Sequence, residues 1–168
     1  MGAGGVGLAP APPRPFDRLV IATGSAAIRL PIPGADLPGV VTFRDLADLD
    51  AIEAAVARRC PVVVIGGGLL GIEAAYGLVR AGLDVTLVHV MDRLMERQLD
   101  DQGAALVVRA LERLGVRVLL AARSVEVEGD GRVEALRLAD GRRLGCGLLV
   151  MAVGVRPETR LAAEAGLA

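Results

Sequence analysis

The stretch VVVIGGGLLGIEAAYG, residues 62 to 77, constrains the fold of this chain more than any other. Its glycines follow the spacing G-x-G-x-x-G, which binds phosphate only between a strand and a helix. Gly66 permits a tight turn, Gly68 lets a pyrophosphate approach the backbone, and Gly71 lets the helix pack closely on the strand. The alternative is a glycine-rich turn needed only for packing. We predict that a dinucleotide binds here through Gly66, Gly67, Gly68, Leu69, Leu70 and Gly71.

The flanking segments predict an α/β fold with a Rossmann-like parallel sheet and an antiparallel β-meander crossover. Apolar periodicity indicates helices over 43–59, 69–82 and 100–114. The helix over 43–59 would bury one face formed by Leu46, Leu49, Ile52, Ala55 and Val56. Short apolar runs indicate strands over 18–22, 61–66, 84–90, 116–121 and 148–154, the last of them ended by Arg156-Pro157. Two alternating runs with Gly-Asp-Gly and Asp-Gly turns place the meander over 124–144.

The bulk composition excludes several classes of function. The formal net charge is -1 and only 2% of the residues are aromatic, which argues against a nucleic-acid surface. No apolar run is long enough to span a bilayer, and no signal peptide is recognised. Cys60 and Cys146 form no CxxC pair and fit two reduced thiols in a cytoplasmic protein. The single histidine leaves no basis for a Ser/His/Asp triad, and no metal site is expected.

The choice between NADH and NADPH stays open in the sequence. An NAD site usually places an acid at the end of the second strand to bind the ribose hydroxyls, and this chain has His89 there. A neutral histidine can hydrogen-bond a ribose, whereas a protonated one tolerates a 2′-phosphate. Arg93 could also meet a phosphate. The structural alternative for both residues is a solvated strand end, which explains Arg93 as well as a phosphate contact does. Glu73 is expected in the first turn of the glycine-loop helix, where the helix dipole alone favours a carboxylate.

Four stretches occur in an order that resembles a known family. They are FDRLVIATGS, TFRDLADLDAI, VVVIGGGLLGIEAA and LLVMAVGVRPETRLA. Together they resemble the pyridine-nucleotide-dependent flavoprotein oxidoreductases, which have two dinucleotide-binding domains. Within that family, VTLVHVMDRLMERQLD is most similar to the large subunits of assimilatory NAD(P)H nitrite reductases, with rubredoxin and ferredoxin reductases as close relatives. The resemblance spans residues 16 to about 165.

The resemblance implies a function and residue roles. NAD(P)H would pass a hydride to FAD, and the cofactors would carry the chemistry. Glu73 would lie near the nicotinamide, and Gly154 would line the nucleotide pocket on the closing strand. Thr23, Gly24 and Arg44 would touch FAD; a strand-ending turn and a surface arginine are their structural alternatives. Two departures from the family pattern are His89 and Gly147, which stand where relatives usually carry acids.

The resemblance also predicts a domain organisation. Residues 1–15 would be a disordered leader, although they carry a second G-x-G-x-x-G without a strand before it. Residues 16–42 would be a partial FAD-domain segment and linker, 43–158 the NAD(P)H-binding domain and 159–168 a tail. Because the main FAD fingerprint and the cysteine clusters of the larger relatives are missing, we expect a fragment or truncated homologue of a reductase. Its partners would be the missing FAD-domain half or an iron–sulfur/sirohaem domain, and a homo-oligomer is also possible.

Three hypotheses remain open in the sequence. The chain is part of an NAD(P)H-to-FAD electron-transfer enzyme, most like nitrite reductase or else a rubredoxin or ferredoxin reductase. Alternatively, it is a non-catalytic module that binds NAD(P)H as a sensor or a remnant. The third hypothesis is a gene product that keeps its fold without a function. Flavin bound on purification favours the first, and nucleotide binding without flavin favours the second.

Overall fold

The computed structural model describes residues 17–167, so the predicted leader and the glycine pattern within it lie outside the described residues. The chain divides into two compact units. One extends from Ser25 to Pro157 and contains the glycine-rich stretch. Of the described residues, the other combines residues 17–24 with residues 158–167.

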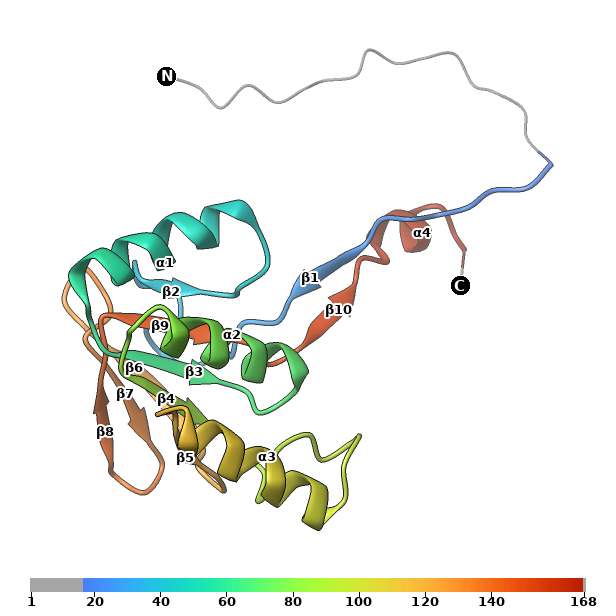
Figure 1. Ribbon diagram of the computed structural model, residues 1–168. Coiled ribbons are helices and arrows are strands. Elements are labelled where there is room, and N and C mark those ends of the chain that lie inside the picture. The colour runs from blue at the N-terminus through green and yellow to red at the C-terminus, as the bar shows by residue number, and fades with distance from the viewer. Residues whose placement is uncertain (1–16, 168) are drawn as a thin grey trace. The chain divides into compact units, whose positions relative to one another are not determined.

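A five-stranded parallel sheet is the centre of the larger unit (Figure 1). The strand order is β2-β9-β3-β4-β5, and every neighbouring pair is parallel. The strands are β2 (Val40–Val41), β3 (Val62–Ile65), β4 (Val85–Val88), β5 (Arg117–Leu119) and β9 (Leu148–Met151). The last four confirm the predicted strands. The edge strand β2 was not predicted, because two residues are too few for a sequence pattern.

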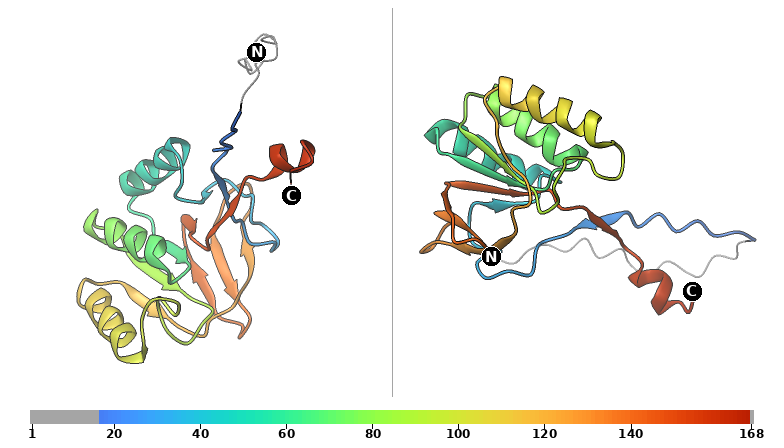
Figure 2. Two further views of the ribbon diagram at one scale, coloured as in Figure 1. Left: turned by 90° about the vertical axis from the view of Figure 1, so that its right-hand side faces the viewer. Right: turned by 90° about the horizontal axis from the view of Figure 1, so that it is seen from below.

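Three helices cover one face of this sheet (Figure 2, left). They are α1 (Leu46–Arg58), α2 (Leu69–Arg80) and α3 (Asp101–Arg113), and they confirm the three predicted helices. Asp45 caps α1 by accepting a hydrogen bond from the N–H of Asp48, and Asp100 caps α3 through the N–H of Gly103. Helix α2 is different, since its N-cap is Gly68 and has no side chain to accept such a bond.

The predicted meander covers the opposite face. Its strands β6 (Ser124–Glu128), β7 (Ala135–Leu138) and β8 (Arg143–Gly145) form an antiparallel sheet of their own. Strand β6 carries a register shift between Ser124 and Glu126. The chain thus confirms the predicted order β-α-β-α-β, meander, β, and the unit has three layers (Figure 2).

Both faces of the central strands are buried, so the core has two halves. Val62 and Val64 of β3 pack with residues of the helices, whereas Val63 and Ile65 pack with the meander. Strand β9 alternates in the same way. This explains why the strands are continuous apolar runs rather than alternating ones. The polar groups of the sheet are satisfied by strand pairing, and only the strand ends are available for a ligand.

Two sequence predictions about strands were wrong. Residues 18–22 are not a strand, and Leu19, Val20 and Ile21 are exposed. An apolar run forms a strand only beside a partner strand, and none lies beside this run among residues 17–167. The chain also does not stop pairing at Arg156-Pro157. Residues Val155–Pro157 form β10, which pairs antiparallel with β1 (Ser25–Ala27).

The smaller unit contains one short helix, α4 (Arg160–Glu164), in the predicted tail. The Arg160 guanidinium pairs with the Glu164 carboxylate at 3.1 Å. The N–H of Glu158 donates to the carbonyl of Gly24 at 2.9 Å, and the Thr23 hydroxyl donates to the carbonyl of Glu158. Among residues 17–167, no helix has both the length and the apolar character needed to cross a lipid bilayer.

The buried face of α1 differs from the prediction at its first turn. Leu46 and Leu49 are exposed, whereas Asp48 is buried. The Asp48 carboxylate accepts hydrogen bonds from the N–H and hydroxyl of Thr42 and from the N–H of Arg44. The helix is thereby rotated to place the carboxylate against the chain that leaves β2. Burial raises the pKa of Asp48, but these hydrogen bonds and one from the Asp45 backbone outweigh it, and the net pKa is lowered.

We expect Asp48→Asn to lower the free energy of unfolding by about 1–3 kcal/mol at neutral pH, because an amide cannot accept all of these bonds. The folded-state pKa lies below the unfolded value, so the contribution is present above about pH 4 and disappears as the pH falls through the folded pKa. Urea denaturation at several pH values measures this difference. The exposed Asp50→Asn in the same helix is the control. An equal loss in both variants would contradict the assignment.

Candidate functional site

A pocket of about 560 Å³ opens where β3, β4 and β9 end at their carboxyl sides. In open parallel sheets this edge is where ligands bind. The pocket brings together the predicted nucleotide residues of three segments: the glycine loop, the end of β4 and the end of β9. The predicted residues that line it are Gly66, Gly67, Gly68, Leu69, Leu70, His89 and Gly154.

Two glycines of the loop are required by the fold. Gly66 has a φ of 119°, and a Cβ there would overlap the carbonyl of Ala152. A Cβ on Gly71 would overlap the carbonyl oxygen of Gly66. Both findings agree with the expected roles, a tight turn at Gly66 and close helix–strand packing at Gly71. The loop therefore has the backbone geometry of a dinucleotide-binding turn, but close packing of the helix on the strand is enough to explain both glycines.

Gly68 is different, because the fold does not require a glycine there. Its φ is -81° and its ψ is -179°, a conformation that any residue adopts. A Cβ on Gly68 would meet no atom within 4 Å. The residue is the N-cap of α2 and offers no side-chain acceptor to the first N–H groups of the helix. An uncapped helix N-terminus beside open space is the arrangement that binds a phosphate.

His89 lines the pocket, and both of its ring nitrogens have protein partners. The ring is buried, and the N–H of Gly67 donates to Nδ1 at 3.0 Å. Nδ1 must therefore be unprotonated, which places the proton of the neutral ring on Nε2. Nε2 lies 3.1 Å from a carboxylate oxygen of Glu96 and donates to it. The imidazole thus connects the glycine loop to an acid seven residues further along the chain.

Sequence reasoning missed several residues of this pocket. Glu96 lines it, as do Arg97, Arg123 and Ser124. The Ser124 hydroxyl is buried and has no hydrogen-bond partner among residues 17–167, so it can bond to a ligand. The pKa of Glu96 is lowered, mainly by a hydrogen bond from its own backbone N–H and further by His89, so the group is a carboxylate at neutral pH. The sequence signal for Glu96 was weak, because this residue lies in the loop after the second strand and not at the end of the strand, where an acid is expected.

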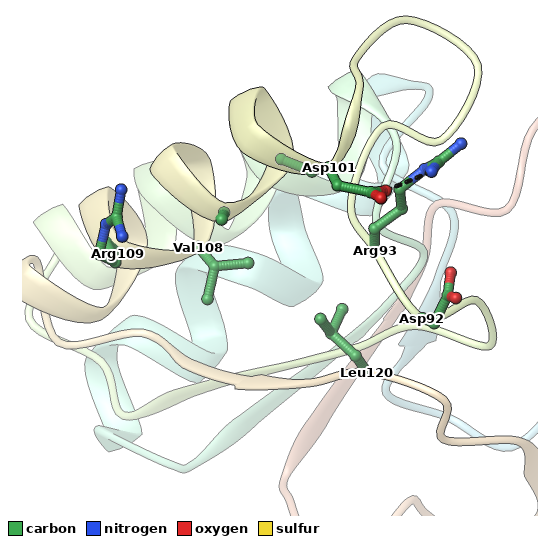
Figure 3. Close-up of a pocket in the computed structure, with 8 residues that line it drawn as sticks. Asp92, Arg93, Asp101, Val108, Arg109 and Leu120 are labelled. Carbon is green, nitrogen blue, oxygen red and sulfur yellow. Dashed lines mark hydrogen bonds and ion pairs between the residues drawn. The ribbon is translucent and has the colours of Figure 1, made fainter.

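Arg93 does not line this pocket. It belongs to a second pocket of about 420 Å³ between α3 and the loop after β4, where its guanidinium pairs with Asp101 (Figure 3). One of its terminal nitrogens also donates to the carbonyl of Glu96 at 3.5 Å. The structure therefore separates Arg93 from the glycine loop, and its predicted contact with a nucleotide phosphate has no geometric support.

Four other predicted residues also do not line the pocket: Glu73, Thr23, Gly24 and Arg44. Glu73 is exposed, and the first turn of α2 contains no acid because the helix begins at Leu69; the expected first-turn position was therefore wrong. The Arg44 side chain bonds the hydroxyl and carbonyl of Ser25, at 2.6 and 3.2 Å. Gly147 lies against Cys60, since a Cβ there would come within 2.8 Å of the Cys60 Cβ. An acid at position 147 would not fit without movement of Cys60.

The described residues contain no metal-ligating cluster and no disulfide. Among residues 17–167, no group of three or more His, Cys, Asp or Glu side chains is arranged to hold an ion. Cys60 is half-buried and Cys146 is buried, and both are free thiols. Burial raises the pKa of Cys146 to about 12, with a smaller contribution from Cys60, so Cys146 is an unreactive thiol at neutral pH.

Comparisons with known proteins place these features in a family. Residues 13–168 match the sequence profile of the pyridine nucleotide-disulphide oxidoreductases. The chain is 49% identical over 154 residues to the NAD(P)H nitrite reductase of Bacillus subtilis, a match that covers 92% of this chain and 19% of that protein. It is 40% identical over 156 residues to the ferredoxin–NAD(+) reductase component of the biphenyl dioxygenase system of Paraburkholderia xenovorans, covering 93% of this chain and 38% of that protein.

A solved structure shares the fold. The NAD-dependent persulfide reductase from A. fulgidus superimposes with a TM-score of 0.85 at 32% identity, over 90% of this chain and 28% of that one. This likeness confirms the predicted α/β fold class. The chain therefore spans only 19% to 38% of the length of these relatives.

Gly71→Ala and Gly77→Ala are expected to change stability in opposite directions. Both glycines lie in α2, but a Cβ on Gly77 would meet no atom within 4 Å. Alanine at 77 should raise the free energy of unfolding by about 0.5–1 kcal/mol through helix propensity. Alanine at 71 should lower it by about 3 kcal/mol because helix and strand are forced apart. Thermal and urea denaturation give both values. Equal effects would show that α2 does not pack closely on β3.

Cys146 should not react with a thiol reagent in the folded protein at neutral pH. The test uses Cys60→Ser, in which Cys146 is the only thiol left. Labelling by a disulfide reagent should then be limited by unfolding and become complete in denaturant. Rapid labelling of the folded variant would contradict the burial of this thiol.

Proposed function

Because this chain belongs to the pyridine nucleotide-disulphide oxidoreductase family, we propose that its larger unit binds NAD(P)H and presents the nicotinamide to a flavin. Members of the family use FAD and NAD(P)H as cofactors. The observation that carries the proposal is Gly68, which the fold leaves unobstructed at an uncapped helix N-terminus. A glycine turn kept only for packing would need Gly66 and Gly71 but not Gly68.

The strand order suggests the direction in which the nucleotide lies. The pyrophosphate would sit over β3, at the N–H groups that begin α2. Residues after the second strand of such a fold bind the adenosine ribose, which assigns the β4 and β5 side to the adenosine. The nicotinamide would then extend toward the end of β9, on the other side of β3. Gly154, with a φ of 111°, lines the pocket on that side.

The reaction we propose is hydride transfer from the nicotinamide to the flavin, which the cofactors supply when bound. This chain's residues would bind and orient the nucleotide. Its glycine loop would hold the pyrophosphate, and the exposed Leu69 and Leu70 would form an apolar rim beside it. The contacts of Thr23, Gly24 and Arg44 with FAD, and of Glu73 with the nicotinamide region, are further proposals that rest on the family resemblance.

We also propose which group receives the electrons from the flavin. The similarity to nitrite reductase favours an acceptor that feeds nitrite reduction, through an FAD-binding part and an iron–sulfur or sirohaem domain as partners. A ferredoxin is the alternative, because the ferredoxin reductase component is also similar. A third candidate is a module that binds NAD(P)H without catalysis. Reduction of added FAD by NADH, followed as loss of flavin absorbance, distinguishes the enzyme from the module.

Gly68→Ala should raise the Kd for NADH at least tenfold, about 1.4 kcal/mol, since the new methyl group would occupy the space assigned to the pyrophosphate. Stability should change by less than about 1 kcal/mol, because no protein atom is displaced. Isothermal titration calorimetry and denaturation measure the two effects. Gly77→Ala is the matched control and should leave the Kd unchanged. An unchanged Kd in Gly68→Ala would refute pyrophosphate binding at this loop.

A further inference from the structure

We infer that Glu96, held in place by His89, is the carboxylate that binds the adenosine ribose of the nucleotide and selects NADH over NADPH. The inference rests on the proposed function and deepens it, since it assigns the cofactor preference to one residue. It also accounts for the absence of an acid at position 89. The acid is supplied from the following loop instead.

The backbone around Glu96 is fixed to the glycine loop. The N–H of Met95 donates to the carbonyl of Gly67 at 2.9 Å, and the N–H of Gly67 donates to His89. Leu94 is completely buried, and a Cβ on Gly67 would come within 2.5 Å of its side chain. Three contacts therefore tie this segment to Gly67. Glu96 is positioned relative to the same loop that would hold the pyrophosphate.

The imidazole of His89 fixes the carboxylate itself. Because Nδ1 accepts from Gly67, Nε2 must donate, and it meets Glu96 at 3.1 Å. The Glu96 carboxylate thus lies beside the imidazole of His89, the residue that directly follows β4. Its side chain is 29% exposed, and it lines the pocket. A carboxylate in this position can accept hydrogen bonds from ribose hydroxyls, and it repels a 2′-phosphate.

Arg97 and Arg123 are the competing groups, because they line the same pocket and would attract a 2′-phosphate. Both are exposed, and neither makes an ion pair with another side chain of residues 17–167. Their side chains would have to be ordered on binding, at a cost in conformational entropy. Glu96 is already ordered by His89. We therefore assign the preference to the fixed negative charge rather than to the arginines.

The test measures the Kd of NADH and of NADPH by calorimetry for three proteins. The unsubstituted chain should bind NADH more tightly than NADPH. Glu96→Gln should raise the Kd for NADH about tenfold and should not raise the Kd for NADPH. The ratio of the two constants should therefore shift at least tenfold. Asp92→Asn removes the same charge from an exposed residue of the same loop, which lines the other pocket, and should leave both constants unchanged.

His89→Asn tests the positioning role separately. The asparagine carbonyl can still accept from Gly67, but no donor then reaches Glu96. The ratio of the two constants should shift in the same direction as in Glu96→Gln. If His89 had only a structural role, His89→Asn would weaken the binding of NADH and of NADPH by the same factor.

The outcomes separate this inference from the proposed function. If the unsubstituted chain binds neither nucleotide, the proposed function fails and the assignment fails with it. If it binds NADH but Glu96→Gln leaves the ratio unchanged, only the assignment of Glu96 is overturned. Tighter binding of NADPH than NADH by the unsubstituted chain would give the decisive role to Arg97 and Arg123 and would also overturn the assignment.

Discussion

Helix α2 begins so close to the end of β3 that no side chain fits between Gly71 and the carbonyl oxygen of Gly66. This contact brings the first N–H groups of the helix to the carboxyl edge of the sheet. It also requires the turn at Gly66, which has a positive φ and lies against Ala152, the residue that follows the neighbouring strand β9. The position of the pocket follows from this contact, because the pocket floor is the turn itself.

A second set of contacts connects this turn to the next strand. Gly67 donates to His89 and accepts from Met95, so both of its peptide groups are used by the segment after β4. A change in the glycine loop would therefore be transmitted to Glu96 through one imidazole. In the proposed binding mode, this connection joins the phosphate side of the pocket to the ribose side before the dinucleotide binds, which lowers the ordering cost of binding.

The sequence predicted the elements whose signals are local. The apolar runs of β3, β4, β5 and β9, the three long helices and the meander turns all depend on neighbouring residues, and all were found. The strand expected over residues 18–22 failed because a strand also needs a partner edge, which a local pattern does not report. The predicted burial of Leu46 and Leu49 was wrong because the hydrogen bonds of Asp48 override the apolar periodicity at the start of α1.

The residues of the candidate site also divide into those with a local sequence signal and those without one. The glycine loop, His89 and Gly154 carry their signal in the motif or the family pattern, and the structure gathers them in one pocket. Glu96 and Arg123 enter it from loops, and Ser124 enters it from the start of β6; no spacing rule of the sequence describes these positions. Arg93 shows the reverse case, since its position after the second strand suggested a phosphate contact, whereas its guanidinium pairs with Asp101 in the second pocket.

The N-termini of the three long helices, α1, α2 and α3, support the proposal that the glycine loop is more than a packing device. Helices α1 and α3 have aspartate caps that accept from their own first-turn N–H groups. Helix α2 could have the same kind of cap, because position 68 has an ordinary backbone conformation and open space around it. An aspartate there would satisfy the helix and stabilise it by about 1 kcal/mol. Its absence leaves the one helix that points at the pocket uncapped, which is unfavourable for stability unless a phosphate takes the place of the missing carboxylate.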